Sequence, residues 1–150
     1  MNLEQQRRPI PKWYWIVSVV ALLWNLMGFA VFLTDVFAQE MAIESTSGAQ
    51  KEWAREIPSW VYFVFAISVT TGVAGSICLL IRKAWAIPLF AISVIAVVIQ
   101  MDYTILIAGG LQVNLEADGP PSLVMPTLVI VFACGLLWFS RFAKGRSWLV

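Results

Sequence analysis

Four long runs of apolar residues constrain this chain more than any other feature of its sequence. They cover about residues 13–37, 60–81, 85–108 and 123–142. A helix needs about 20 mainly apolar residues to cross the hydrocarbon core of a bilayer, and it satisfies its own backbone hydrogen bonds there. The sequence therefore predicts an all-α polytopic membrane protein, in which a bundle of four transmembrane helices forms a single membrane domain over residues 1–150.

The composition excludes most alternatives to a membrane protein. Hydrophobic residues make up 60% of the chain and charged residues only 13%, whereas a soluble domain has about 25% charged residues. The net charge of +1 gives no reason to expect a nucleic-acid partner. The chain has no His, the commonest metal ligand and general base, and it has no nucleophile motif or phosphate-binding loop. We therefore predict that it is not an enzyme and that it carries no cofactor and no metal.

The distribution of Lys and Arg predicts the orientation of the four spans. Cytoplasmic loops of membrane proteins carry an excess of these residues. Lys51 and Arg55 fall on one side of the predicted bundle, and all the others fall on the opposite side: Arg7, Arg8, Lys12, Arg82, Lys83, Arg141, Lys144 and Arg146. We therefore predict that both termini are cytoplasmic.

Two loops lie on the other side of the predicted membrane. In the first, residues 38–59, Ser47 and Gln50 have the spacing of a helical capping box. The pattern predicts a short helix on the outer membrane surface with Trp53 dipping into the bilayer. This loop is either a solvated connector or a lid over a binding site. The second loop, residues 109–122, is rich in Gly and Pro, which predicts irregular structure.

Small and hydroxyl residues form a stripe along the second span. Residues three and four apart share one face of a helix, and the stripe consists of Ser68, Thr71, Gly72, Gly75 and Ser76. Small residues at this spacing let helices approach closely in a membrane. We therefore predict that Gly72, Gly75 and Ser76, together with Gly28 of the first span, pack against neighbouring helices.

Two amides, Asn25 and Gln100, lie on the smaller and more polar faces of the first and third spans. If both faces turn toward the second span, the bundle interior holds two amides, several hydroxyls and no charge. One interpretation is hydrogen bonding between helices, worth about 1 kcal/mol or less per bond. The other is a binding site for a small neutral solute, with Asn25, Gln100, Trp24 and Ser68 as its tentative residues.

Asp102 introduces a carboxylate into the third span. It is two positions from Gln100 and therefore points to nearly the opposite side of the helix, among aliphatic residues. A carboxylate facing lipid costs about 2.5 kcal/mol or more, and no Lys or Arg lies at its depth. We predict that Asp102 contacts a second subunit or reaches the outer headgroups; proton coupling is a third interpretation. Asp35, at the outer end of the first span, is predicted to be solvated.

Two segments of the chain resemble known proteins. They are ALLWNLMGF, residues 21–29, and LLIRKAWAIPLFAISVIAVVIQMDY, residues 79–103. With them the chain resembles, over nearly its whole length, a group of small four-helix bacterial inner-membrane proteins, which are mostly hypothetical proteins and sometimes described as sugar transporters. The resemblance implies a location in a bacterial inner (plasma) membrane and favours transport, and it carries over no catalytic or binding residue.

Two classes of function remain open at this point. One is a permease or channel for a small neutral solute, which needs a homo-oligomer because four helices enclose little space. The other is a non-catalytic binding or scaffolding subunit that packs against another membrane protein. A water-lined cavity that reaches Asn25 and Gln100 would favour transport, and a tightly packed, dry core with an apolar outer groove would favour the second role. The predicted partners are the lipid bilayer and either a second copy or another membrane protein.

Overall fold

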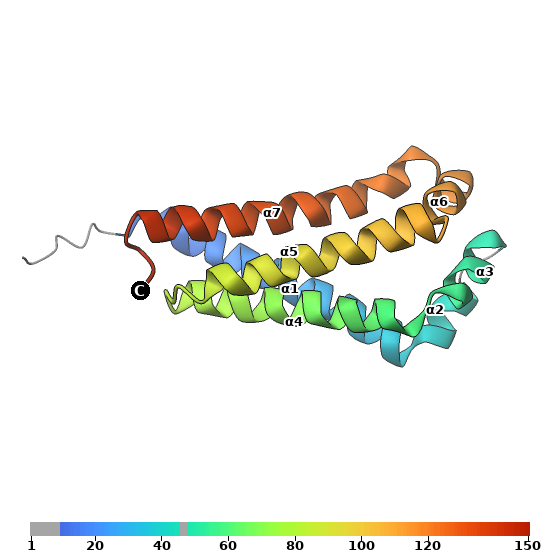
Figure 1. The fold of residues 1–150 in the computed structure, drawn as a ribbon, viewed down its shortest axis with the longest axis horizontal. Helices are drawn as coiled ribbons and strands as arrows, with labels where there is room; N and C mark the ends of the chain where they lie inside the picture. Colours follow the sequence, from blue (N-terminus) through green and yellow to red (C-terminus); the bar gives the residue numbers. More distant parts are fainter. Residues whose placement is uncertain (1–9, 46–47) are drawn as a thin grey trace, which may run out of the picture.

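The four apolar runs form four long helices, as predicted. A computed structural model describes residues 10–45 and 48–150, and every regular element in these ranges is helical. Each long helix, taken with the helical residues that directly continue it, is long and apolar enough to cross a membrane, with mean hydropathies between 2.1 and 2.3 over its most apolar stretch. They lie side by side in one bundle (Figure 1) and comprise α1 (Lys12–Phe37), α4 (Ser59–Leu80), α5 (Ala86–Asp102) and α7 (Val124–Gly145).

Proline marks the starts of these helices. Pro11 and Pro58 directly precede α1 and α4 in extended conformation. Pro88 and Pro126 lie in the first turns of α5 and α7, where the missing N–H has no partner within the helix in any case. Proline therefore helps to set where each span begins without breaking it.

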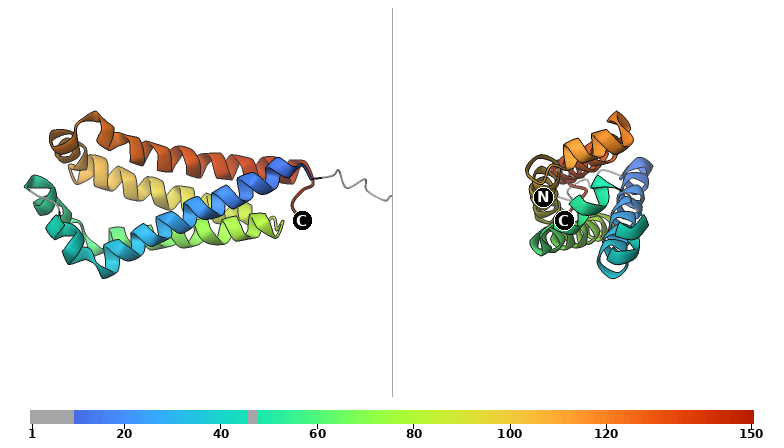
Figure 2. Two further views of the ribbon diagram at one scale, coloured as in Figure 1. Left: turned by 180° about the vertical axis from the view of Figure 1, so that it is seen from behind. Right: turned by 90° about the vertical axis from the view of Figure 1, so that its right-hand side faces the viewer.

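The two ends of the bundle differ. The start of α1 and the C-terminus lie together at one end, here called the terminal end, and the short helices α2, α3 and α6 lie at the other, here called the loop end (Figure 1). Within the bundle, α4 packs against both α1 and α5, and α5 packs against α7. Figure 2 shows that α1 and α7 approach each other at the terminal end and separate toward the loop end.

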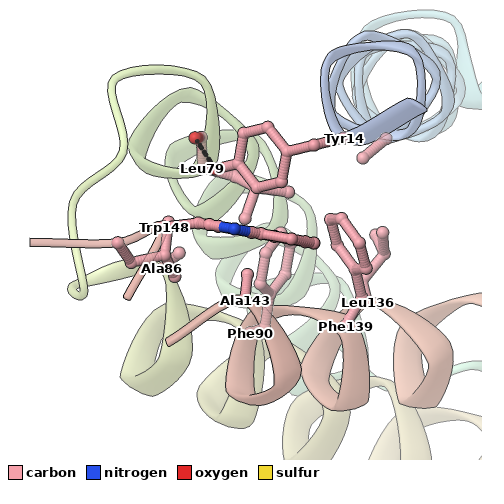
Figure 3. Packing of buried hydrophobic residues seen from close by; sticks show 10 residues of the cluster. Tyr14, Leu79, Ala86, Phe90, Leu136, Phe139, Ala143 and Trp148 are labelled. Carbon is pink, nitrogen blue, oxygen red and sulfur yellow. Dashed lines mark hydrogen bonds between the residues drawn. The ribbon is translucent and has the colours of Figure 1, made fainter. Parts of the chain in front are cut away.

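A cluster of aromatic and aliphatic side chains fills the terminal end (Figure 3). Tyr14 and Leu79 are completely buried and Phe90 is 2% exposed. The Tyr14 hydroxyl donates a hydrogen bond of 2.6 Å to the Leu79 carbonyl, so its polar atom is satisfied within the cluster. The other members come from α1, α5, α7 and the residues after α7: Ala21, Ala86, Leu136, Phe139, Ala143, Trp148 and Leu149.

Both α4 and α7 end at the terminal end in a Schellman motif. Arg82 and Ser147 adopt the left-handed conformation, with φ of 62° and 60°. In each turn the next residue donates its backbone N–H to the carbonyl five positions earlier. The Lys83 N–H bonds to the Cys78 carbonyl at 2.7 Å, and the Trp148 N–H bonds to the Ala143 carbonyl at 3.0 Å. This pattern caps helix carbonyls that otherwise lack partners. Glycine usually takes the left-handed position, so both turns carry a side chain where glycine is favoured.

Residues 148–150 are bonded to the turn between α4 and α5. The Val150 N–H donates to the Arg82 carbonyl at 2.7 Å, and the Ala84 N–H donates to the Val150 carbonyl at 2.7 Å. The Arg82 guanidinium adds a bond of 2.8 Å from Nε to the Trp148 carbonyl. These bonds hold Trp148 in the cluster and close the terminal end of the bundle.

The loop end is more regular than the sequence suggested. The first loop forms α2 (Gln39–Ser45) and α3 (Ala49–Glu56), so the predicted short helix is present; Ser47 of the predicted capping box lies outside the described residues, and Gly48 directly precedes α3. The prediction of irregular structure over 109–122 is wrong, because this segment forms α6 (Gly110–Asp118) and a 3₁₀ helix, η2 (Pro120–Leu123).

The glycines of the second loop explain that error. Gly109 and Gly119 have φ of 73° and 71° and flank α6 on its two sides. Only glycine adopts such angles at low cost, so these residues bound a helix instead of preventing one. A segment rich in Gly and Pro is typical of a loop, but here Gly109 and Gly119 lie at the two ends of α6.

The span of α5 continues as a π-helix, η1 (Tyr103–Ile107). The Ala108 N–H donates to the Tyr103 carbonyl, five positions earlier, at 2.8 Å. A π-helix accommodates an additional residue in each turn, and such segments occur frequently at functional sites. This one begins directly after Asp102 and reaches the loop end.

Candidate functional site: two joined cavities

A cavity of about 220 Å³ lies between the four long helices and is here called the central cavity. The four residues that the sequence suggested as a binding site, Trp24, Asn25, Ser68 and Gln100, all line it, and so does Gly28. The remaining lining residues are mainly apolar, and none is charged among the described residues. The structure therefore brings the tentative binding residues, from α1, α4 and α5, to one cavity.

Most polar groups of the central cavity already bond within the protein. Asn25 donates through Nδ2 to the Ala21 carbonyl at 2.8 Å and to the Ser76 hydroxyl at 3.1 Å. The hydroxyls of Ser68 and Ser93 each donate to the other residue's backbone carbonyl, at 3.3 and 2.9 Å. These bonds join α4 to α1 and α5. For Asn25 and Ser68, the interpretation as contacts between helices is therefore supported.

Trp24 forms a wall of the central cavity from α1. Its ring stacks on Phe132 of α7, with centroids 4.5 Å apart and an interplanar angle of 20°. One of its faces is therefore already used for packing. The stack joins α1 to α7.

A second cavity, of about 350 Å³, lies at the loop end and is here called the loop-end cavity. Its walls come from α1, α2, α3, α4, α5, η1, α6 and α7. Phe65, Gln100 and Met101 line both cavities. The two spaces are therefore neighbours, with these residues between the loop end and the middle of the bundle.

Gln100 occupies the junction with an unsatisfied polar atom. In residues 10–45 and 48–150, two buried side-chain polar atoms lack a hydrogen-bond partner, Gln100 Oε1 and Trp53 Nε1. Both residues line the loop-end cavity. Buried polar groups nearly always have partners, and leaving one unsatisfied costs about 1–3 kcal/mol. Both atoms therefore carry an uncompensated polar cost in residues that line the same cavity.

Trp53 packs against α6, a contact that the sequence did not predict; its predicted insertion into the bilayer stays a prediction. A Cβ atom at Gly110 would lie 2.7 Å from the Trp53 ring, so only glycine lets the indole approach so closely. The Gln50 amide also donates to Asn114 of α6 at 3.3 Å. Helices α3 and α6 are thus held together at the loop-end cavity, and the first loop contributes a wall of the site.

Asp35 does not lie at an open helix end. It is partly buried and lines the loop-end cavity. Residues of α2 and α3, including Ile43 and Ala54, line the same cavity, because the chain folds back over the outer end of α1. The first loop thus covers part of a helix end that the sequence suggested was free, and solvation of Asp35 within the cavity stays a prediction.

Asp102 lies apart from this site. Its side chain is exposed, and it lines neither cavity, in keeping with its position two residues from Gln100 on a helix. It therefore does not join Asn25 and Gln100 in a common polar site. Contact with a second subunit or with lipid headgroups stays a prediction for this carboxylate.

The small residues of α4 lie where helices approach most closely. Gly72, Gly75 and Ser76 are buried, and Gly28 is partly buried. A Cβ atom at Gly72 would collide with the Asn25 amide oxygen, and one at Gly75 would lie 3.0 Å from the Phe90 ring. At Gly28 the nearest atom, on Val69, would be 3.9 Å away. Gly72 and Gly75 are thus the positions where close contact requires glycine.

The loop-end cavity was missed from the sequence. Gln100 and Thr104 share one face of the third span, but the other polar residues of the cavity, Asp35, Trp53 and Asn114, come from distant helices, and no spacing within one segment brings these together. The single available signal was Asp35 itself, a carboxylate inside an otherwise apolar run. Ionisable residues at membrane depth mark functional sites by default, but the helix end offered a simpler explanation.

Nothing beyond the chain's own geometry assigns a role to this site. Among the described residues, no three His, Cys, Asp or Glu side chains form a group that could hold a metal ion. Comparisons with protein-family models, with curated proteins and with solved structures find no match to this chain.

Proposed function

We propose that the chain is a small multi-pass membrane protein that binds a small solute in the two joined cavities and carries it across the membrane as a permease. The observation that carries this proposal is Gln100, whose buried amide oxygen lacks a partner at the junction of the two spaces. No charged side chain lines the central cavity among the described residues. The part of the solute that lodges there is therefore neutral.

A carrier agrees better with the packing than a channel does. The proposed path through the two cavities stops at Phe90 and Leu136, which line the central cavity and also belong to the cluster at the terminal end. A site near mid-membrane that is reached from one side is what alternating access requires of each state. A single chain encloses cavities of about 220 and 350 Å³, so binding does not need the homo-oligomer that the sequence suggested.

Transport is tested by uptake into vesicles that contain the purified protein. Labelled polyols, sugars and small amides form the panel, and protein-free vesicles give the background. Val129 lines the central cavity, so Val129→Trp fills it and lowers uptake about tenfold or more, a barrier increase of about 1.4 kcal/mol. Val131→Trp is the matched control, because Val131 is 61% exposed on the same helix. Background uptake of the whole panel by folded wild-type protein would contradict the proposal.

The proposed orientation places the terminal end in the cytoplasm of a bacterial cell, with the protein in the inner membrane. The support is the basic side chains at the terminal end, among them Lys83 and Lys144. Single cysteines replace Lys51 or Lys144 in a chain without Cys78 and Cys134. A membrane-impermeant thiol reagent added to intact cells is expected to label position 51 and not position 144. The reverse labelling would invert the orientation and make the cavities face the cytoplasm.

A second candidate function is the scaffolding role. The central cavity is lined partly by exposed residues of α1 and α7, namely Met27, Val31 and Met125, so it borders the side of the bundle. An apolar segment of another membrane protein fits such an opening. In that case the purified protein takes up no solute, and Met125→Trp at this side weakens a stoichiometric complex, whereas Val131→Trp leaves it intact.

A further inference from the structure

We infer that the loop-end cavity is a subsite for an organic ammonium group, so that the preferred ligand is a small amphipathic amine. Its uncharged part would lie in the central cavity. This inference rests on the proposed function and names the ligand class of the same site. It depends on three features of the cavity walls: one carboxylate, a set of aromatic rings and the junction with the central cavity.

The carboxylate is Asp35. Among the described residues that line the two cavities, it is the charged one, and no Lys or Arg joins it there. It is partly buried at the outer end of α1. Removing a carboxylate from water is costly unless a positive charge or several hydrogen bonds compensate. A cationic ligand would supply that compensation, whereas an anionic ligand would be repelled.

Aromatic rings accompany this carboxylate in the cavity. Trp53, Tyr62 and Phe65 line it from α3 and α4. A cation within about 6 Å of an aromatic ring centroid is stabilised by roughly 0.5–2 kcal/mol, and tryptophan gives the strongest interaction. A carboxylate together with aromatic faces is the set of groups that binds an organic ammonium. An alkali or alkaline-earth ion would instead need several oxygen ligands in one shell.

The junction gives room for the remainder of such a ligand. Beyond Phe65, Gln100 and Met101 the path continues into the central cavity, whose walls are mainly apolar. The unpartnered oxygen of Gln100 lies between the charged and the apolar spaces. It is placed to accept a hydrogen bond from a neutral hydroxyl or amide of the ligand. The order of groups along the path, a carboxylate, an amide and then apolar walls, matches an amphipathic amine.

The test compares two probes of nearly equal shape, 2-phenylethylamine, which is protonated at neutral pH, and 2-phenylethanol. Binding is measured by calorimetry on the full chain in nanodiscs of zwitterionic lipid, with empty nanodiscs subtracted. Wild-type protein is expected to bind the amine about tenfold more tightly, a difference of about 1.4 kcal/mol. Asp35→Asn removes this preference, so that the amine and the alcohol bind this variant with similar affinity. Asp35→Glu keeps the charge and therefore keeps the preference.

Asp102→Asn is the matched control, because it removes a carboxylate that lines neither cavity; it is expected to keep the preference. Equal wild-type affinities for the two probes would overturn the inference, even if Asp35→Asn does not fold. Loss of the preference in Asp102→Asn as well would also overturn it, since a general surface-charge effect would then suffice. If the alcohol binds without any preference for the amine, and Val129→Trp blocks it, the subsite fails while the proposed function stands. If neither probe binds and no solute is taken up, both fail.

Discussion

The terminal end and the loop end of the bundle use the same kinds of residues in different ways. At the terminal end, aromatic rings fill the space between helices, and Phe90 is 2% exposed. At the loop end, Phe65 instead borders two cavities. The polar groups differ in the same sense: the Tyr14 hydroxyl bonds to a carbonyl at 2.6 Å, whereas Trp53 Nε1 and Gln100 Oε1 are buried without partners.

This difference separates stability from function along one bundle. Dense packing and satisfied hydrogen bonds hold the helices together at one end, and the opposite end keeps unfilled volume and unsatisfied groups that a ligand can use. Natural proteins depart from complete packing and polar satisfaction mainly at functional sites. Three substitutions, each with a matched control, test whether the two ends differ in energy as they do in geometry.

The largest expected effect comes from removing a ring at the terminal end. Phe90→Ala leaves a cavity in a packed cluster, where such changes cost about 3–5 kcal/mol. Phe65→Ala enlarges a space that is already open and is expected to cost clearly less. Unfolding in mixed detergent micelles measures both free energies. Equal losses of stability would show that the loop end is packed as tightly as the terminal end.

A smaller effect is expected where two helices touch. Gly72→Leu inserts a side chain against Asn25 and Ser93, and overpacking of this kind costs about 1–3 kcal/mol. Gly135→Leu is the control, because a Cβ atom there meets nothing within 4 Å. The melting temperature in detergent should fall for the first variant and stay nearly constant for the second. A constant melting temperature for Gly72→Leu would mean that α4 does not pack as described.

The smallest effect concerns a turn at the terminal end. Ser147 has φ of 60°, a conformation that costs a residue with a side chain about 1 kcal/mol or more. Ser147→Gly is therefore expected to raise the free energy of unfolding by up to about 1 kcal/mol. Arg82→Gly relieves the same backbone conformation but also removes the bond from Nε to Trp148, so its gain should be lower. A greater gain at Arg82 would show that this bond contributes little to closing the bundle.

The sequence predicted the parts of the fold that lipid dictates. The four spans follow from hydropathy alone, and their observed bounds, such as Lys12–Phe37 and Ser59–Leu80, lie close to the predicted ones. Helical periodicity also placed Asn25 and Gln100 on inward faces, because α1 and α5 each have a single face of small and polar residues. These inferences depend on local patterns, each of which lies within a single helix.

The rest depends on contacts between distant segments. Trp53 and Gly110 lie in contact because α3 and α6 fold toward each other, and no pattern within either segment predicts this contact. The same folding covers Asp35 and encloses the loop-end cavity. The π-helix at Tyr103–Ile107 was also not predicted, since its residues are as apolar as those of an ordinary span. Periodicity describes the faces of one helix but not which neighbour covers them.

The bonds of residues 148–150 to the turn after α4 have a consequence for biosynthesis. These residues follow all four spans in the chain, so a ribosome completes every membrane helix before it releases them. The Arg82 carbonyl and the Ala84 N–H can bond to Val150 only after Val150 has been synthesised. Trp148 likewise joins the cluster only after all four long helices have been made. Until residues 148–150 are released, all four long helices have been made but the terminal end lacks Trp148 and Val150. The order of synthesis therefore lets this end close only after every long helix is complete.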